Sequence, residues 1–179
     1  MSVSPIEINQ QLKRTKLLLL DVDGVLTDGS IVYNDEGIET KAFNVKDGLG
    51  LRLLMEAGIK VGIATGRSSE ALYTRCRDLR INKEYIFDNL KDKAAILDII
   101  TARADVSAEN TAFIADDLPD IPMMKRVGTP IAVADAHNAV IEHAVLTTKA
   151  KGGKGAVREI CEAILEAQGI WRHILEKFS

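Results

Sequence analysis

Two carboxylates spaced one residue apart follow directly on a run of four leucines, and no other feature constrains the fold as strongly. Leu17–Leu20 has the length and apolarity of a buried strand, and Asp21 and Asp23 stand where that strand ends. Because open α/β sheets bind ligands at the carboxyl ends of their strands, both side chains can face such a crevice. Close carboxylates repel each other unless a cation or a shared proton relieves them, and oxygen ligands favour Mg²⁺. An acidic turn, as in Asp-Gly and Thr-Asp-Gly, is the structural alternative.

The rest of the chain alternates short apolar segments with amphipathic ones. This alternation predicts a doubly wound, Rossmann-like α/β fold, in which helices cover both faces of a parallel sheet. The expected strands are residues 17–22, 60–64, 85–87, 111–115 and 130–133. After a polar helical turn at the N-terminus, the expected helices are residues 48–57, 69–79, 91–103, 119–127, 138–143 and 156–168.

Residues 31–43 break this pattern. Apolar segments at 31–33 and 40–43 are joined by Asn34-Asp35-Glu36-Gly37, which predicts a β-hairpin directly after the acidic motif. Such a hairpin could fold over the site as a flap or lie beside it.

Size and composition limit the class of protein. A chain of 179 residues suits one domain with a substantial core, and we expect residues 1–179 to form it. A net charge of -3 offers no basic field for nucleic acid, and no apolar run reaches the roughly 20 residues that span a bilayer. Residues 1–16 lack a signal-peptide pattern, so we expect a cytoplasmic protein. Cys76 and Cys161 are far apart, which predicts reduced thiols.

Polar residues also follow the second expected strand. Thr65, Gly66 and Arg67 place a hydroxyl, a flexible backbone and a guanidinium where a strand gives way to a helix. Backbone N–H groups and an arginine at a helix start suit an anion such as phosphate. A capped helix beside a surface arginine is the alternative interpretation.

Two later strand ends carry charged residues. Asp116, Asp117 and Asp120 follow residues 111–115, and three such carboxylates need a cation or exposure to solvent. A helix start capped by Asp117 is compatible with that requirement. Lys93 lies just past residues 85–87. A lone lysine is usually a surface residue, so Lys93 is a candidate site residue only because the other strand ends carry charged and polar residues.

Along the chain, successive strand ends carry Asp-x-Asp, then Thr, then Lys, then Asp-Asp. In this order of motifs the chain resembles the haloacid dehalogenase superfamily of phosphotransferases over nearly its whole length. The resemblance implies that Asp21 is a nucleophile that forms an aspartyl-phosphate and that Asp23 is the general acid and base. It implies that Thr65 and Lys93 bind the phosphoryl oxygens. An aspartate at position 23 is typical of phosphatases and mutases in the superfamily, rather than of transport ATPases or dehalogenases.

The resemblance also implies a Mg²⁺ site. Asp21, the backbone carbonyl of Asp23 and Asp116 would hold the ion and offset the charges of the carboxylates and phosphate. Asp117 or Asp120 would orient the motif lysine or a metal-bound water.

The spacing between the motifs leaves no room for a cap domain over the site. Only about 35 residues separate Asp28 from the next strand and about 25 separate Arg67 from Lys93, which is too few for a separate domain. The chain therefore resembles the capless branch of the superfamily, whose members are tetramers with this hairpin packed between subunits. By that resemblance we expect a homotetramer in which a neighbouring subunit covers the site.

Several segments resemble the sugar acid phosphatases of that branch, which act on an eight-carbon 2-keto sugar acid phosphate in lipopolysaccharide precursor biosynthesis. They are DVDGVLTDG at 21–29, KDGLG at 46–50, AVADAH at 132–137, GGKGAVREIC at 152–161 and AQG at 167–169. The resemblance implies substrate contacts, in addition to those of Asp23 and Lys93, from Asn44, Val45, Lys46, Asp47, Gly48, Gly66, Arg67 and Arg75.

The C-terminal part, residues 149–179, combines a glycine-rich segment with a helix. By the same resemblance, residues 152–155 would reach into an adjacent subunit's site, and a flexible linker is the alternative. Trp171 and Phe178 predict that the end of the chain docks on this subunit or another.

Other functions compete with this one. A phosphatase for a nine-carbon sugar acid phosphate fits the sequence equally. A non-catalytic assembly module would not need Asp21, Asp23, Thr65, Lys93 and Asp116 together, because an acidic pocket is costly. A phosphomutase would need a closed site that keeps water from the phosphoenzyme.

Overall fold

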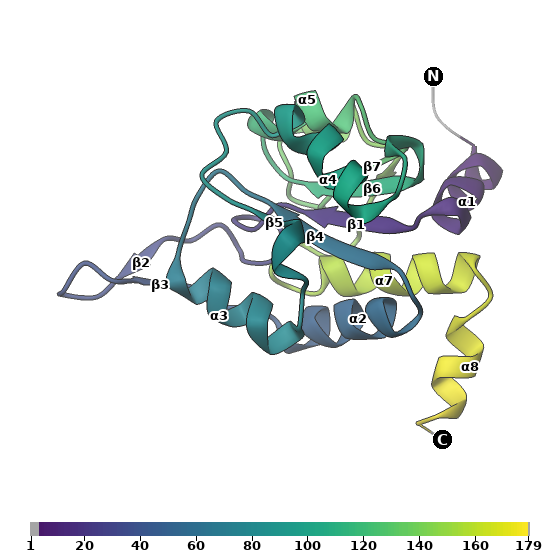
Figure 1. The fold of residues 1–179 in the computed structure, drawn as a ribbon, viewed down its shortest axis with the longest axis horizontal. Helices are drawn as coiled ribbons and strands as arrows, with labels where there is room; N and C mark the ends of the chain where they lie inside the picture. The colour runs from purple at the N-terminus through teal and green to yellow at the C-terminus, as the bar shows by residue number, and fades with distance from the viewer. Residues whose placement is uncertain (1–3, 179) are drawn as a thin grey trace.

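The computed structural model describes residues 4–178, so the outermost residues of the expected 1–179 domain lie outside the described part. Six parallel strands form one sheet in the order β5-β4-β1-β6-β7-β8, with helices on both faces (Figure 1). This confirms the doubly wound α/β fold, and residues 4–178 form no cap domain. The strands are β1 (Leu17–Leu20), β4 (Lys60–Ala64), β5 (Ile86–Phe87), β6 (Thr111–Ala115), β7 (Thr129–Ala132) and β8 (Leu146–Thr147).

Strand β1 lies inside the sheet between β4 and β6, and all four of its leucines are fully buried. A strand covered on both faces has no polar alternation, which explains the continuous apolar run. Leu20 aligns with Ile63 of β4 and Ile114 of β6, so the three strands end at the same level. The residues that follow them are thereby brought to one edge of the sheet.

In Figure 1, α2 and α7 lie together below the sheet, and α4 and α5 lie above it. Helix α7 buries a stripe that includes Val157, Ile160, Cys161 and Ile164. Gly50 in α2 permits close packing here, because a Cβ at this position would lie 2.9 Å from Cδ of Arg158. The helices are α1 (Pro5–Arg14), α2 (Val45–Glu56), α3 (Glu70–Leu79), α4 (Leu97–Ala104), α5 (Ile121–Met124), α6 (Asn138–Ile141), α7 (Ala156–Ala167) and α8 (Trp171–Glu176). Among residues 4–178, none of these is long and apolar enough to cross a membrane.

Local capping moves several helix boundaries away from those expected. Ser4 caps a ten-residue α1, where only a helical turn was expected. Asn44 accepts a hydrogen bond from the N–H of Lys46 at 2.8 Å, so α2 begins at Val45 rather than at residue 48. The expected helix 91–103 begins later, with a 3₁₀ turn before α4, because Asp92 accepts from the N–H of Ala94 at 2.9 Å. Strand β8 and helix α8 were not expected at all.

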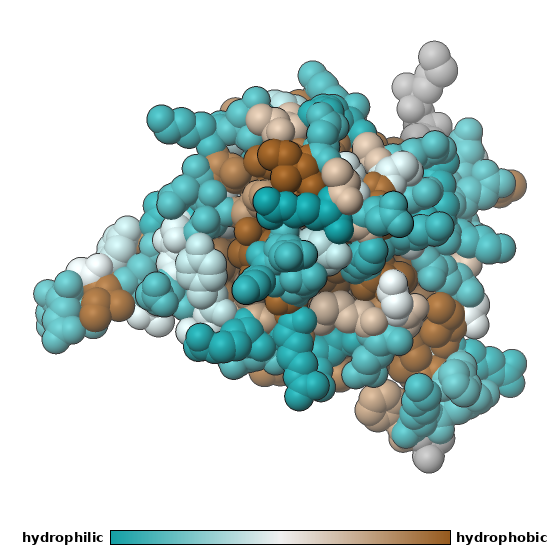
Figure 2. All heavy atoms as spheres, viewed as in Figure 1, coloured by the Kyte–Doolittle hydropathy of each residue, from teal (hydrophilic) through white to brown (hydrophobic). Residues whose placement is uncertain are grey.

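The predicted hairpin is present but shorter than expected. Its strands, β2 (Val32–Tyr33) and β3 (Glu39–Thr40), pair antiparallel. It projects from the body of the molecule, and Figure 2 shows apolar atoms on it amid a largely hydrophilic surface. The exposed apolar side chains of the hairpin are Ile31, Val32, Tyr33 and Ile38.

The glycine-rich segment packs against its own subunit, which corrects the alternative that it acts as a flexible linker, and its reach into a neighbouring subunit's site stays a prediction. The N–H of Gly153 donates to the carbonyl of Val25 at 3.0 Å, and the N–H of Gly152 donates to Asp135 at 2.9 Å. A Cβ on Gly152 would lie 1.7 Å from the carbonyl oxygen of Gly24, so only glycine fits. The segment thus supports the acidic loop after β1.

The C-terminal end meets its docking expectation only in part. Trp171 packs on the core, with the guanidinium carbon of Arg158 5.5 Å from its ring centroid. Phe178 is 69% exposed and so does not dock on this subunit, and its docking on another subunit stays a prediction.

Candidate active site

The residues after β1, β4, β5 and β6 line a common cavity of about 310 Å³ at the carboxyl edge of the sheet. This is where open α/β sheets bind their ligands. Its lining consists of Asp21, Asp23, Thr65, Gly66, Arg67, Leu90, Lys91, Lys93, Asp116, Asp117, Pro119 and Asp120. All four motifs of the sequence therefore meet in one place.

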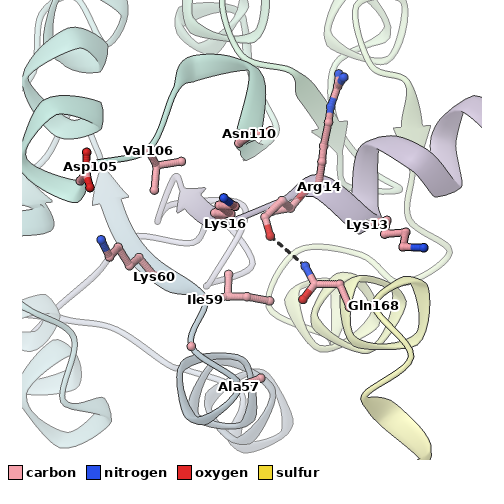
Figure 3. Close-up of a pocket in the computed structure, with 12 residues that line it drawn as sticks. Lys13, Arg14, Lys16, Ala57, Ile59, Lys60, Asp105, Val106, Asn110 and Gln168 are labelled. Atoms are coloured by element: carbon pink, nitrogen blue, oxygen red, sulfur yellow. Dashed lines mark hydrogen bonds between the residues drawn. The ribbon is translucent and has the colours of Figure 1, made fainter.

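A larger cavity, of about 710 Å³, lies at the opposite edge of the sheet, around the start of β1 and β4 (Figure 3). Several basic side chains line it, but Lys13 and Arg14 extend away from its centre, and Lys60 donates to the carbonyl of Ala104. Arg14 also pairs with Glu109 at 2.7 Å. The basic side chains of this larger cavity are thus paired with other groups or point away from its centre, and they do not converge on one point. The candidate active site is therefore the smaller, acidic cavity.

Lys93 joins two of the aspartates in the acidic cavity. Its ammonium lies 2.8 Å from Oδ1 of Asp21 and 2.5 Å from Oδ1 of Asp120, and its side chain is only 6% exposed. Burial lowers the pKa of Lys93, but the charges of Asp21 and Asp120 outweigh it and leave the pKa above its ordinary value. Lys93 is therefore a fixed positive charge beside Asp21.

Asp116 completes a carboxylate cluster with Asp21 and Asp120, whose oxygens lie within 4.8 Å of one another. Oδ1 of Asp116 is buried and receives no hydrogen bond. Burial first, and then the charges of Asp21 and Asp120, raise the pKa of Asp116. Gly24 makes room for this carboxylate, since a Cβ there would lie 2.0 Å from Oδ2 of Asp116.

This cluster fits a divalent cation. Three carboxylates face a single ammonium, that of Lys93, so negative charge is in excess among these groups. An oxygen donor set with an unpaired buried oxygen on Asp116 is what Mg²⁺ prefers. Asp21 and Asp116 were expected as side-chain ligands, and the structure places Asp120 beside them.

The two expected supporting aspartates lie in different surroundings. Asp120 is buried, and besides pairing with Lys93 it accepts from the N–H of Asp116 at 3.2 Å. Asp117 is exposed and caps the turn after β6 by accepting from the N–H of Leu118 at 2.8 Å. Of the two, Asp120 is the one that contacts the lysine.

Thr65 and Arg67 lie on the other side of the cavity. Thr65 is buried, and its hydroxyl accepts from the N–H of Arg67 at 3.4 Å. Gly66 lies between them at the surface, and Arg67 is 42% exposed. A hydroxyl, backbone N–H groups and a guanidinium can together bind an anion here.

Sequence reasoning missed two charged residues of the hairpin that enter the site. Lys41 pairs with both Asp23 and Glu39, and Glu39 also pairs with Arg67 at 2.7 Å. Burial lowers the pKa of Lys41, but hydrogen bonds to Asp23 and Glu39 leave it raised overall. Glu39 and Lys41 are two residues apart on a strand and its extension, a spacing that places both on one face and could have signalled the pair.

The remaining expected substrate contacts do not line this cavity. Asn44, Val45, Lys46, Asp47, Gly48 and Arg75 lie around the start of α2. Arg75 donates to the carbonyl of Asn44 at 3.1 Å and fills the space beside Gly48.

The side chain of Asp47 is buried in the packing of α2 against α7, and the substrate contact expected at this residue stays a prediction. Asp47 is 1% exposed, and its Oδ1 accepts from the N–H of Arg158 at 2.8 Å, at the start of α7. Burial raises the pKa of Asp47, and backbone hydrogen bonds from Arg158 and Gly155 oppose this rise. Asp47 therefore joins α2 to α7.

Comparison with known proteins places this geometry in a family. Residues 84–160 match the haloacid dehalogenase-like hydrolase family. The 3-deoxy-D-manno-octulosonate 8-phosphate phosphatase KdsC of Escherichia coli (strain B / BL21-DE3) is 40% identical over 91% of this chain and 86% of the relative. The enzyme of the same name from Salmonella typhimurium is 41% identical over 93% of this chain and 87% of the relative.

Solved structures agree with the sequence relatives. The structure of the phosphatase from Yersinia pestis has a TM-score of 0.90 and 41% identity, over 93% of this chain and 89% of that chain. The enzyme from Moraxella catarrhalis, solved in complex with a magnesium ion, a phosphate ion and a KDO molecule, has a TM-score of 0.95 and 40% identity, over 98% of this chain and all of that chain. The chain therefore belongs to the haloacid dehalogenase-like hydrolases, in the family of the 3-deoxy-D-manno-octulosonate 8-phosphate phosphatases.

Proposed function

We propose that this protein is a Mg²⁺-dependent phosphatase that hydrolyses 3-deoxy-D-manno-octulosonate 8-phosphate to the free sugar acid and phosphate, a step in lipopolysaccharide precursor biosynthesis. The observation that supports this most is the meeting of Asp21, Asp23, Lys93 and Asp116 in one cavity. The family relatives carry the same activity in their names and cover almost the whole chain.

In the first step, an oxygen of Asp21 attacks phosphorus, and the bond from phosphorus to the sugar oxygen breaks. Lys93 beside Asp21 and the donors at Thr65 stabilise the negative charge on the phosphoryl oxygens. Asp23 gives its proton to the departing sugar oxygen, so the alcohol leaves neutral and an aspartyl-phosphate remains.

In the second step, a water molecule attacks the phosphorus of the aspartyl-phosphate. Asp23, now a carboxylate, takes a proton from that water, and the bond between phosphorus and Asp21 breaks. Phosphate leaves, Asp21 returns to a carboxylate, and Asp23 is protonated for the next cycle.

Asp21 and Asp116, with the backbone carbonyl of Asp23, are the residues that would hold Mg²⁺. The ion supplies charge neutralisation between the phosphate and the carboxylates, which would otherwise repel each other. Asp120 fixes the position of Lys93 and of the loop that carries Asp116.

Arg67 is the residue we assign to the sugar acid. Its guanidinium is partly exposed and pairs with the carboxylate of Glu39 at 2.7 Å, so it already binds a carboxylate in this structure. A substrate carboxylate suits the same bidentate donor. The cavity does not distinguish eight carbons from nine, and a nine-carbon sugar acid phosphate is the alternative substrate.

The test is phosphate release from 3-deoxy-D-manno-octulosonate 8-phosphate with Mg²⁺, beside the nine-carbon analogue and p-nitrophenyl phosphate. We expect kcat/KM to be highest for the eight-carbon substrate and EDTA to abolish turnover. A preference for the nine-carbon compound would move the protein to the alternative substrate. No metal-dependent release from any of the three would contradict a catalytic role and favour an assembly module.

We also propose that the protein is a cytoplasmic homotetramer in which the hairpin packs between subunits. Support comes from the hairpin itself, whose Ile31, Val32, Tyr33 and Ile38 side chains are about half exposed or more on a projecting element. Large apolar side chains gathered in this way typically mark an interface. A neighbour's hairpin could then cover the open site.

Light scattering after size exclusion tests this assembly. We expect a mass close to four times that of the chain, and a smaller species for Val32→Ser with Ile38→Ser, because both changes add polar groups to the buried interface. Ile99→Ser, which alters an exposed apolar side chain in α4, is the matched control and should remain tetrameric. A monomeric wild-type protein would refute the assembly.

A further inference from the structure

Lys41 is a charged side chain buried in a part of the molecule that has little apolar core. Its side chain is 2% exposed, although it follows a projecting hairpin whose apolar residues are exposed. Burial of an ammonium is costly unless carboxylates surround it, and Lys41 pairs with Asp23 and with Glu39 at 2.6 Å. The hairpin is therefore tied to the floor of the active site by a buried ion pair.

The two oxygens of Asp23 differ in their contacts. Oδ1 is paired with Lys41, whereas Oδ2 is buried and receives no hydrogen bond, with Nε of Arg67 at 3.7 Å. Asp23 lines the cavity that also contains Asp21. With one oxygen anchored, the carboxyl group cannot rotate freely about its terminal torsion, which is otherwise broad. Oδ2 is then the oxygen of Asp23 that has no hydrogen-bond partner.

The anchor continues through Glu39 to the far side of the cavity. Glu39 pairs with Lys41 through Oε1 and with Arg67 through Oε2. Negative and positive groups alternate from Asp23 through Lys41 and Glu39 to Arg67. Lys41 is therefore the group that links Asp23 to Glu39.

We propose that Lys41 is a positioning residue for the reaction, which holds Oδ1 of Asp23 so that Oδ2 gives the proton to the leaving alcohol. The proposal rests on the proposed function, since it concerns the acid step of that mechanism. It makes the hairpin part of the active site within a single subunit, in addition to any contact between subunits.

The test uses two substrates that differ in how much protonation the leaving group needs. p-Nitrobenzyl phosphate releases an alcohol, like the sugar acid phosphate, and depends on the acid. p-Nitrophenyl phosphate has nearly the same size but releases a stable phenolate. Because kcat/KM reports steps up to the cleavage of the bond from phosphorus to oxygen, it isolates the acid step from hydrolysis of the phosphoenzyme.

The variant is Lys41→Met combined with Glu39→Gln, which removes the ammonium and leaves no unpaired glutamate charge behind. Lys41→Met alone serves as a second variant. Lys83→Met, at an exposed lysine in the 3₁₀ turn that precedes β5, is the matched control. Circular dichroism and thermal melting establish that each variant is folded before its kinetics are compared.

For both Lys41 variants we expect kcat/KM to fall about 100-fold for the sugar acid phosphate and for p-nitrobenzyl phosphate, which is the lower end of a general acid's contribution. For p-nitrophenyl phosphate the fall should stay within about fivefold, and Lys83→Met should change neither. Equal losses on the two nitro compounds in a folded variant would overturn the positioning role, as would no loss on either. Asp21→Asn distinguishes failure of the proposed function from failure of the Lys41 proposal. If Asp21→Asn retains wild-type turnover, the proposed function fails and this inference fails with it.

Discussion

Asp21→Asn should lower kcat by roughly 10⁴-fold or more, equivalent to about 5.4 kcal/mol of transition-state stabilisation. An amide is isosteric with the carboxylate but is a poor nucleophile toward phosphorus, so the aspartyl-phosphate would not form. The amide keeps the size of a side chain that is packed beside Lys93 at the end of β1. Wild-type enzyme quenched in acid should carry labelled phosphate that hydroxylamine releases, and Asp21→Asn should carry none.

Two controls separate a nucleophile from a metal ligand at position 21. If Asp21 only bound Mg²⁺, a higher Mg²⁺ concentration would restore turnover, and we expect no such rescue. Asp78→Asn, an exposed carboxylate in α3, should keep wild-type rates. Turnover above about a tenth of wild type in Asp21→Asn would contradict the assignment.

Asp116→Asn should abolish activity while stabilising the metal-free protein. The amide removes one charge from a cluster with Asp21 and Asp120 whose oxygens lie within 4.8 Å. Mg²⁺ affinity, measured by calorimetry, should fall by at least the factor of about 10 to 100 that loss of an outer-shell partner costs. In EDTA, at a pH above the raised pKa of Asp116 of about 8, where this carboxyl is charged, the melting temperature should instead rise by about 2–4 °C for each kcal/mol of repulsion relieved.

The sign of the pH dependence follows from the raised pKa of Asp116, which burial and the neighbouring charges cause. A carboxyl whose pKa is higher in the folded protein binds its proton more tightly there, so it contributes stability at low pH. That contribution is lost as pH rises from the ordinary aspartate pKa of about 4 toward the raised value. Metal-free wild type should therefore lose stability between about pH 4 and the raised pKa of Asp116 of about 8, and Asp116→Asn should lose less.

Asp78→Asn is the control for this experiment as well, and its melting curve should follow wild type with and without Mg²⁺. If Asp116→Asn melted below wild type in EDTA and bound Mg²⁺ equally well, the carboxylate cluster would not be the metal site.

Most of the sheet could be predicted because its signal is local. A continuous apolar run such as Leu17–Leu20 occurs only where helices cover both faces, and the structure buries all four residues. Strand β8 (Leu146–Thr147) escaped prediction because two residues at a sheet edge carry no periodic pattern. The observed helix boundaries differ from the expected ones because single capping contacts, such as that of Asn44, decide where a helix begins.

The part of the site that lies at the ends of the strands could be predicted from the sequence. Residues after β1, β4, β5 and β6 meet because parallel strands end at a common edge, so Asp21, Thr65, Lys93 and Asp116 line one cavity. The hairpin contacts were not predictable in this way, since Lys41 reaches Asp23 across a turn whose path no local pattern specifies. The contact between Asp47 and the N–H of Arg158 was not predictable either, because it depends on how α7 packs against α2.

By itself, the sequence determined the chemistry of this protein: the order of carboxylates, hydroxyl and lysine along the chain, and the alternation that makes a parallel sheet. These are local properties of residue type and spacing. Only the tertiary structure decided which oxygen of Asp23 pairs with Lys41, which aspartate supports Lys93, and that the glycine-rich segment packs against its own acidic loop. Such contacts depend on distances between residues far apart in the chain, and those distances are set when the core packs as a whole.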